Sequence, residues 1–191
     1  GNYDFWYESS QLLVKQMNAM DAANEYLACS LAQLLGINAP KAWLFSSHKQ
    51  IKRISFRHSV GIEFFDGFII ATKEDLLRLQ NEAVRCIIFN LLIDQEDGES
   101  YAVHNGKIYT YDFASAFTMG INFQDAFLKE MKSPSKELSQ FLAQRINLIQ
   151  SVLASEEACE YILIKSEDEK EITLSDFFVS IFAFFGNNSF M

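Results

Sequence analysis

The dipeptide Asn105-Gly106 constrains the fold of this chain more than any other short feature. It separates two runs of alternating apolar and polar residues, "SYAVH" and "KIYTYDF", and it is typical of a two-residue turn between antiparallel strands. An acidic loop precedes the first run, and the second run leads directly into Asp112. The pattern therefore predicts a β-hairpin that connects an acidic loop to an aspartate in apolar surroundings.

The first part of the chain has the pattern of a small antiparallel sheet with one helix. Residues 3–16 contain two aromatic and aliphatic runs around a polar centre, which predicts a hairpin. Residues 20–36 repeat apolar side chains at helical spacing, with Asp21 as the candidate cap and Gly36 as the stop. Three further segments are rich in aromatic and β-branched residues and predict strands: 41–47, 50–58 and 61–70.

A long helix is predicted over residues 72–94, immediately before the acidic loop. Thr72 stands three residues before Asp75, which is the spacing of a capping box at a helix start. Apolar residues then recur with helical periodicity along the whole segment. This helix is expected to form the centre of the second part of the chain.

The rest of the chain reads as mostly helical. Residues 133–154 begin with a serine and a proline and predict a helix, whereas residues 166–185 place an exposed charge run before a Ser175 cap and an apolar helix. We expect one compact unit with two regions. Residues 1–70 would form the sheet with its helix, and residues 71–191 the mainly helical region with the acidic loop and hairpin.

Composition excludes several classes of function. The formal net charge of −9 repels phosphate backbones, so nucleic-acid binding is not expected. No stretch approaches the ~20 apolar residues that span a membrane. Cys29, Cys86 and Cys159 lack the spacing of a metal site and predict buried, reduced thiols. We therefore expect a cytoplasmic protein, although the sequence leaves open secretion into a host cell as an effector.

The order of these motifs resembles the compact protein-kinase-like fold shared by HipA-type kinases and phosphatidylinositol 3-/4-kinases. The resemblance covers roughly residues 5–120 and is carried by "LLVKQ", "NEYLACSLAQLLGINAPKAWLF", "IIFNLLID" and "GKIYTYDFASAF". It implies an α+β, bilobal fold with a cleft between the lobes. It also implies that the cleft binds ATP and Mg²⁺, and that a protein or lipid hydroxyl accepts the phosphoryl group.

The resemblance assigns roles to four residues. Lys15 would contact the nucleotide phosphates, Glu25 would pair with that lysine and orient it, and Asp112 would ligate the metal. A fixed cation offsets phosphate charge, and a carboxylate partner holds the cation in place. Within the acidic loop, Asp97 would position the acceptor hydroxyl when the loop is counted from the preceding helix.

The acidic loop nevertheless departs from the family pattern. The family places an asparagine, a ligand of the second metal ion, five residues after the catalytic aspartate, and Ala102 stands there when Asp97 is the aspartate. Counting from the hairpin moves the asparagine position to Ser100 or Tyr101 and the aspartate position to Gln95 or Glu96. Neither register supplies both residues. A glycine-rich phosphate loop is also not visible, since only Gly1 precedes Lys15.

Several interpretations therefore stay open. The loop carboxylates could hold Mg²⁺ together with Asp112, or they could form a solvated acidic turn; they are Asp94, Glu96, Asp97 and Glu99. The protein could be an atypical or degenerate kinase, or a pseudokinase that serves as a non-catalytic protein-interaction module. A third alternative is an unrelated α+β binding domain, which would fail to place Lys15 near Asp112.

Overall fold

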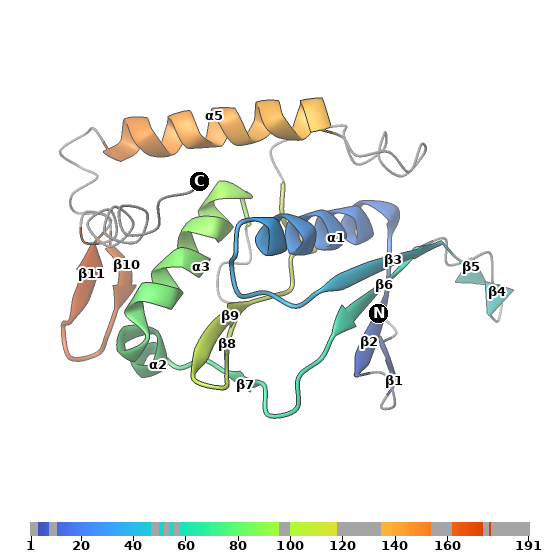
Figure 1. Cartoon of the computed structure of the whole chain (residues 1–191), viewed down its shortest axis with the longest axis horizontal. Helices are drawn as coiled ribbons and strands as arrows, with labels where there is room; N and C mark the ends of the chain where they lie inside the picture. The colour runs from blue at the N-terminus through green and yellow to red at the C-terminus, as the bar shows by residue number, and fades with distance from the viewer. Residues whose placement is uncertain are drawn as a thin grey trace, which may run out of the picture.

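The computed structural model describes residues 4–7, 11–46, 50–51, 54–55, 58–95, 100–117, 135–153, 162–173 and 176. Small antiparallel sheets alternate with helices along these residues, so the prediction of a mixed α+β fold is confirmed (Figure 1). The four-stranded sheet lies at one end of the molecule and the C-terminal hairpin β10–β11 at the other (Figure 1).

The first part of the chain forms a four-stranded antiparallel sheet covered by one helix. Its strand order is β1-β2-β6-β3, and all neighbours are antiparallel. The bounds are β1 Asp4–Tyr7, β2 Leu12–Met17, β3 Ala42–Ser46 and β6 His58–Glu63. Helix α1, Ala19–Leu34, packs through its buried alanines on the face of the sheet that carries Val60. Lys15 stands directly opposite Val60 in the pairing of β2 with β6.

Helix α1 begins earlier than predicted. Its N-cap is Asn18, not Asp21, because the Asn18 side chain accepts a hydrogen bond from the Asp21 backbone N–H (2.8 Å) and donates one to the Asp21 carboxylate (2.7 Å). Asp21 therefore lies in the first turn. The predicted stop at Gly36 is confirmed, since this glycine adopts a left-handed φ of 65° just beyond the helix.

Two of the predicted strands are wrong in extent. Residues 50–58 contain two short paired strands, β4 Gln50–Ile51 and β5 Ile54–Ser55, before β6 begins. The segment 61–70 is also not one strand, because β6 ends at Glu63 and β7, Ile69–Ile70, joins a different sheet. Between them Gly67 has a φ of 77°, a turn conformation that glycine adopts without steric cost.

The Asn105-Gly106 hairpin is confirmed. Strands β8, Tyr101–His104, and β9, Lys107–Thr110, pair around this turn, where the φ values are 48° and 73°. Strand β7 pairs with the outer side of β8, which gives a second sheet of order β7-β8-β9.

The helix predicted over residues 72–94 is two helices. Both hydrogen bonds of the Thr72–Asp75 capping box are present at the start of α2, Lys73–Arg78, so the predicted start is confirmed. The backbone then leaves the helical conformation at Leu79, and α3, Gln80–Leu92, follows. Apolar residues on both sides of this break pack into one cluster with β8, β9 and the C-terminal hairpin, so tertiary packing overrides the local helical pattern.

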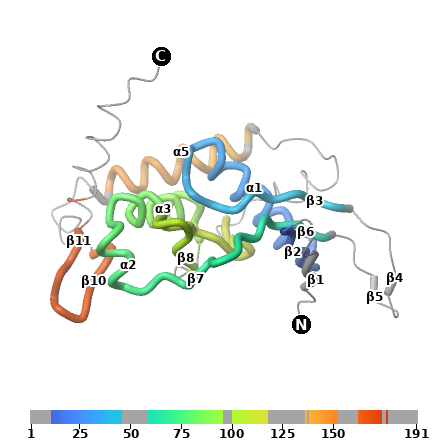
Figure 2. Tube along the Cα trace, turned by 60° about the horizontal axis from the view of Figure 1, so that its bottom comes forward, coloured from blue at the N-terminus to red at the C-terminus, as the bar shows by residue number. Residues whose placement is uncertain are grey.

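The last described elements are α5, Ser135–Leu153, and a hairpin of β10, Ile162–Lys165, and β11, Glu171–Thr173. The hairpin corrects the prediction of helices and loops alone in this region. Its charged tip is exposed, as predicted, while one isoleucine from each strand is buried. Ser175 and the starting residues predicted for α5, Ser133 and Pro134, lie outside the described residues. In Figures 1 and 2, α5 runs across α1 and α3.

The described helices and cysteines can be compared with two further expectations, the lack of a membrane-spanning segment and the presence of buried thiols. None of the helices among them is both long enough and apolar enough to cross a membrane. Cys29 and Cys86 are buried free thiols, as predicted, whereas Cys159 lies outside the described residues.

The main core lies between α1, α3 and α5, and it fixes the segment that follows β9. Phe113 is fully buried and meets Phe89 of α3 edge-on, with ring centroids 5.7 Å apart. Phe117 meets Phe141 of α5 in the same way at 5.5 Å. Because these rings are anchored in the core, the residue just before Phe113 has a fixed position.

Asn90 of α3 links the helix to the second sheet through a buried polar network. Its side-chain amide donates to the Tyr101 hydroxyl (3.1 Å), and the Thr110 hydroxyl donates to its carbonyl oxygen (3.0 Å). We expect Asn90→Ala to lower the free energy of unfolding by about 2 kcal/mol, because two buried hydroxyls each lose a hydrogen bond. Urea unfolding checks this against Asn81→Ala on the exposed side of α3. Equal losses in both variants would contradict it.

Candidate functional site

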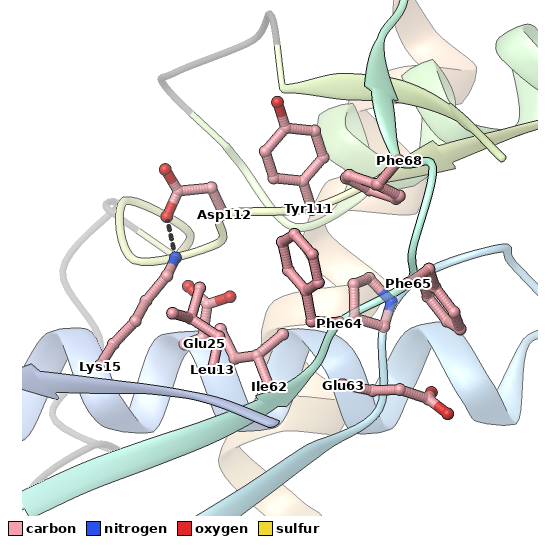
Figure 3. Close-up of a pocket in the computed structure, with 11 residues that line it drawn as sticks. Leu13, Lys15, Glu25, Ile62, Glu63, Phe64, Phe65, Phe68, Tyr111 and Asp112 are labelled. Atoms are coloured by element: carbon pink, nitrogen blue, oxygen red, sulfur yellow. Dashed lines mark hydrogen bonds and ion pairs between the residues drawn. The ribbon is translucent and has the colours of Figure 1, made fainter. Parts of the chain in front are cut away.

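Lys15 and Asp112, which are 97 positions apart in the sequence, meet in the structure. The Lys15 Nζ lies 2.7 Å from the Asp112 Oδ1 in an ion pair (Figure 3). Glu25 of α1 lines the same cavity as both residues. Three of the four predicted site residues are therefore brought together, and the feature expected of an unrelated domain, Lys15 far from Asp112, is not found.

Strand β2 and helix α1 place Lys15 and Glu25 on facing surfaces. Lys15 belongs to the same row of the sheet as Val60, on the side that α1 covers, and its side chain is only 15% exposed. Glu25 is 1% exposed, an extreme burial for a carboxylate. The lysine stem therefore lies along apolar surface, while its ammonium group reaches the edge of the cavity (Figure 3).

Asp112 is held through its backbone. It has a left-handed φ of 63°, a conformation that aspartate adopts more readily than most residues. The Gln95 side-chain amide donates to the Asp112 carbonyl (2.8 Å), and the Asn24 amide donates to the Ala114 carbonyl (2.9 Å). With Phe113 anchored in the core, the turn is fixed on both sides, while the Asp112 side chain stays 51% exposed.

Glu25 has an unusual protonation equilibrium. Burial raises the pKa of Glu25 to about 7, the nearby charge of Lys15 lowers this pKa, and that of Asp112 raises it. The backbone N–H groups of Phe113 and Ala114 lower the pKa by hydrogen bonding. Within the described part of the chain, the Glu25 Oε2 is buried with no hydrogen-bond partner. A neutral solution therefore contains both the charged and the neutral form of this side chain.

The cavity has a volume of about 160 Å³ and two chemically different ends. One end carries the charged groups of Lys15, Glu25 and Asp112, and the other is apolar and largely aromatic (Figure 3). The second end is formed by the sheet, by the connection from β6 to β7 and by the residue before Asp112. Phe64, Phe65, Phe68 and Tyr111 lie at this end (Figure 3), and the cavity is completed by Leu13, Pro40, Ile62 and Glu63.

The aromatic end of the cavity was missed by the sequence analysis. Phe64, Phe65 and Phe68 fall in a segment that was assigned to a strand, yet they lie in the connection between two sheets. Phe68 packs edge-on against Tyr111, with ring centroids 5.2 Å apart, so the connection and the turn before Asp112 form one wall. The Asp66-Gly67 dipeptide inside this segment was the available turn signal.

The role predicted for Asp97 stays a prediction, because residues 96–99 lie outside the described part of the chain. The residues that flank this segment are both attached next to the site. Gln95 donates to the Asp112 carbonyl, and the Tyr111 backbone N–H donates to the Ser100 carbonyl (3.1 Å). Asp94 forms an ion pair with Arg145 of α5 (3.1 Å), which ties the start of the loop to the helical region.

When Asp97 is taken as the catalytic aspartate, the position expected for the second metal ligand carries an apolar side chain. Ala102 lies in β8 opposite Tyr109 and is fully buried, and a methyl group cannot ligate a cation. No group of three or more acidic, histidine or cysteine side chains that could hold a metal occurs among the described residues. Asp112, half-exposed and with the unpartnered Glu25 oxygen in the same cavity, fits a role as one oxygen ligand of a hard cation.

Comparisons with known proteins give limited information. No family model matches the sequence, and no curated protein is significantly similar to it. Among solved structures, the chain is similar to the proinflammatory kinase CtkA of Helicobacter pylori, with a TM-score of 0.49 and 12% sequence identity. That similarity covers 97% of this chain and 75% of the other. At this level of similarity, the function has to be argued from the site itself.

Proposed function

We propose that this protein binds ATP with Mg²⁺ in the described cavity, as an atypical or degenerate kinase-like protein. The observation that carries the proposal is the meeting of Lys15, Glu25 and Asp112 at the charged end of a cavity whose other end is aromatic. The motif order of the sequence assigns the same three residues to phosphate and metal binding, by its resemblance to HipA-type and phosphatidylinositol kinases.

The two ends of the cavity suit the two ends of a nucleotide. A purine base presents flat apolar faces, and Phe64, Phe68 and Tyr111 offer aromatic surface on which it can pack. The Lys15 ammonium would contact the phosphates and offset their charge, with Glu25 behind it. Asp112 would hold Mg²⁺, and the bound ion would neutralise charge on the phosphate oxygens.

If the protein is a catalyst, the reaction is transfer of the γ-phosphoryl group to a protein or lipid hydroxyl. The hydroxyl oxygen would form a bond to the γ-phosphorus while the bond from that phosphorus to the ADP oxygen breaks, and Asp97 would take the hydroxyl proton. This role rests on the resemblance, and the two residues that flank the loop, Gln95 and Ser100, are hydrogen-bonded beside Asp112.

One observation favours the non-catalytic alternative, a pseudokinase that acts as a protein-interaction module. In the register that takes Asp97 as the catalytic aspartate, the buried Ala102 leaves the second metal position without a side-chain ligand. In this alternative, nucleotide binding would persist while ATP turnover would stay at the background level. An assay of ADP release at saturating Mg²⁺ and ATP separates the two alternatives.

Calorimetric titration of ATP, with and without Mg²⁺, tests the proposal directly. We expect Mg²⁺-dependent binding to the wild type and at least about a tenfold loss of affinity in Lys15→Ala, because a cation that contacts the phosphates is removed. Lys107→Ala serves as the matched control, since this exposed lysine does not line the cavity. If the wild type fails to bind millimolar ATP in the presence of Mg²⁺, the proposal is wrong.

A further inference from the structure

Lys15 forms an ion pair with the carboxylate of Asp112, the side chain that is proposed to bind the metal. Its ammonium nitrogen lies 2.7 Å from the Asp112 Oδ1. Since Mg²⁺ binds carboxylate oxygens at about 2.1 Å, an ion on this Oδ1 would lie within about 5 Å of the Lys15 nitrogen. Two cations this close in a partly buried site repel strongly. The ion pair and a metal on the same oxygen therefore oppose one another.

The cavity also offers the ammonium group a second acceptor. The Glu25 Oε2 is buried without a hydrogen-bond partner among the described residues, and Glu25 lines the cavity beside Lys15 and Asp112. In Figure 3 the Lys15 side chain extends toward Asp112, and the Glu25 carboxylate lies close to this pair. A buried carboxylate oxygen without a partner is costly, so a position of Lys15 that supplied one would relieve this cost.

We propose that Lys15 keeps the metal position on Asp112 closed until a nucleotide enters the cavity. This inference rests on the proposed function and adds to it a rule for how the ligands bind. Nucleotide phosphates would draw the ammonium group away from Asp112, and the Glu25 Oε2 would hold it in its new position. Asp112 would then be open to a divalent cation. The nucleotide and the metal would raise each other's affinity by the same factor, because coupling between two binding equilibria is reciprocal.

The backbone of Asp112 is held by contacts that do not involve Lys15. Gln95 holds its carbonyl group, and the following Phe113 is buried in the core. Removing the lysine charge should therefore open the Asp112 carboxylate without moving its backbone. This makes Lys15→Met an informative variant, since methionine keeps an unbranched side chain along the apolar surface and carries no charge.

The test measures Mn²⁺ binding in the absence of nucleotide. The electron paramagnetic resonance signal of the free ion reports how much Mn²⁺ remains unbound. We expect Lys15→Met to bind Mn²⁺ at least about tenfold more tightly than the wild type, because a repelling cation is removed. The gain should disappear in the double variant Lys15→Met, Asp112→Asn. Equal affinities of wild type and Lys15→Met would overturn the inference, and so would a gain that persists in the double variant.

This experiment separates the failure of the inference from the failure of the proposed function, because it contains no nucleotide. The wild type could fail to bind ATP while Lys15→Met shows an Asp112-dependent gain of Mn²⁺ binding. In that case the proposal of nucleotide binding would be wrong, but Lys15 would still block the metal position on Asp112. If the wild type binds ATP but Lys15→Met shows no such gain, the proposal of nucleotide binding would stand, and the inference that Lys15 blocks the metal position would be wrong.

Discussion

Asp112→Asn is expected to abolish the Mg²⁺ dependence of ATP binding. The carboxylate at this position is the metal ligand proposed for the cavity, and an amide offers one neutral oxygen in place of a charged pair. We expect about a 100-fold loss of affinity at saturating Mg²⁺, at the upper end of typical coupling between two ligands. Without Mg²⁺ the affinity should not fall, since Lys15 still contacts the phosphates and no longer pairs with a carboxylate at position 112. Calorimetric titration at both conditions measures the difference.

Asparagine is the suitable replacement because the backbone at Asp112 is left-handed, with a φ of 63°. Asparagine adopts this conformation readily, whereas alanine would add backbone strain. A weaker affinity in an alanine variant could then result from a distorted turn and not from the missing metal ligand. Since half of the Asp112 side chain is exposed, the lost ion pair should change stability by no more than about 1 kcal/mol. Asp168→Asn in the exposed hairpin tip is the control. An unchanged response to Mg²⁺ would exclude Asp112 as the ligand.

The parts of the structure that the sequence predicts well are those fixed by local chemistry. The Thr72–Asp75 box satisfies the free N–H groups of a helix start, and Asn105-Gly106 supplies the positive φ values of a tight hairpin. Both signals act within four residues, so no knowledge of the rest of the fold is needed. It was the resemblance of the motif order to HipA-type and phosphatidylinositol kinases that implied one site for Lys15 and Asp112, and the structure places the two side chains in contact.

The aromatic end of the cavity shows where propensity misleads. Aromatic residues favour strands because they pack well on half-buried sheets, and residues 61–70 are rich in them. In the structure, the sheet ends at Glu63 and the following phenylalanines line a cavity. Aromatic side chains favour partly buried positions both on a sheet and in the wall of a cavity. Composition alone therefore cannot distinguish a strand from a cavity wall. The Asp66-Gly67 dipeptide carries that information, because it is typical of a turn and interrupts the strand pattern.

The hairpin over residues 162–173 was missed for a related reason. Its charged tip was predicted correctly as an exposed segment, but the short apolar runs on either side were not assigned as strands. Each run is three or four residues long, which is too short for a clear alternating pattern. Burial of Ile164 and Ile172 against the cluster around α3 stabilises the pair, and this contact is tertiary.

The sequence contains a signal for the burial of Glu25, but none for the charged and polar groups that surround its carboxylate. Glu25 shares one helix face with Ala22, Cys29 and Ala32, all of which are buried, so it interrupts a face of small residues. Helical spacing could thus have marked it as a buried carboxylate. Its electrostatic surroundings could not be predicted, because Asp112 and the N–H group of Phe113 come from almost 90 residues later.

Glu25→Gln is expected to remove a pH dependence from the stability of the protein. Burial raises the pKa of Glu25 to about 7 in the folded state, from the ordinary value of 4.5 that the unfolded chain retains. A raised folded pKa means that the native state holds its proton more tightly than the unfolded state. The favourable contribution is therefore complete below pH 4.5 and is lost as the pH rises through 7. Glutamine stays neutral and cannot show this loss.

Urea unfolding at pH 5 and pH 8 measures the effect as a difference between the two proteins. We expect the wild type to lose roughly 2 to 3 kcal/mol more than Glu25→Gln between these pH values, because the folded-state carboxyl gives up its proton within this range. Other groups titrate equally in both proteins and cancel. Glu167→Gln in the exposed hairpin tip should follow the wild type. If Glu25→Gln loses as much stability as the wild type, Glu25 is not held in its neutral form. The unpartnered Oε2 would then have a cation or a water beside it at neutral pH, which would weaken the case for Lys15 moving toward it.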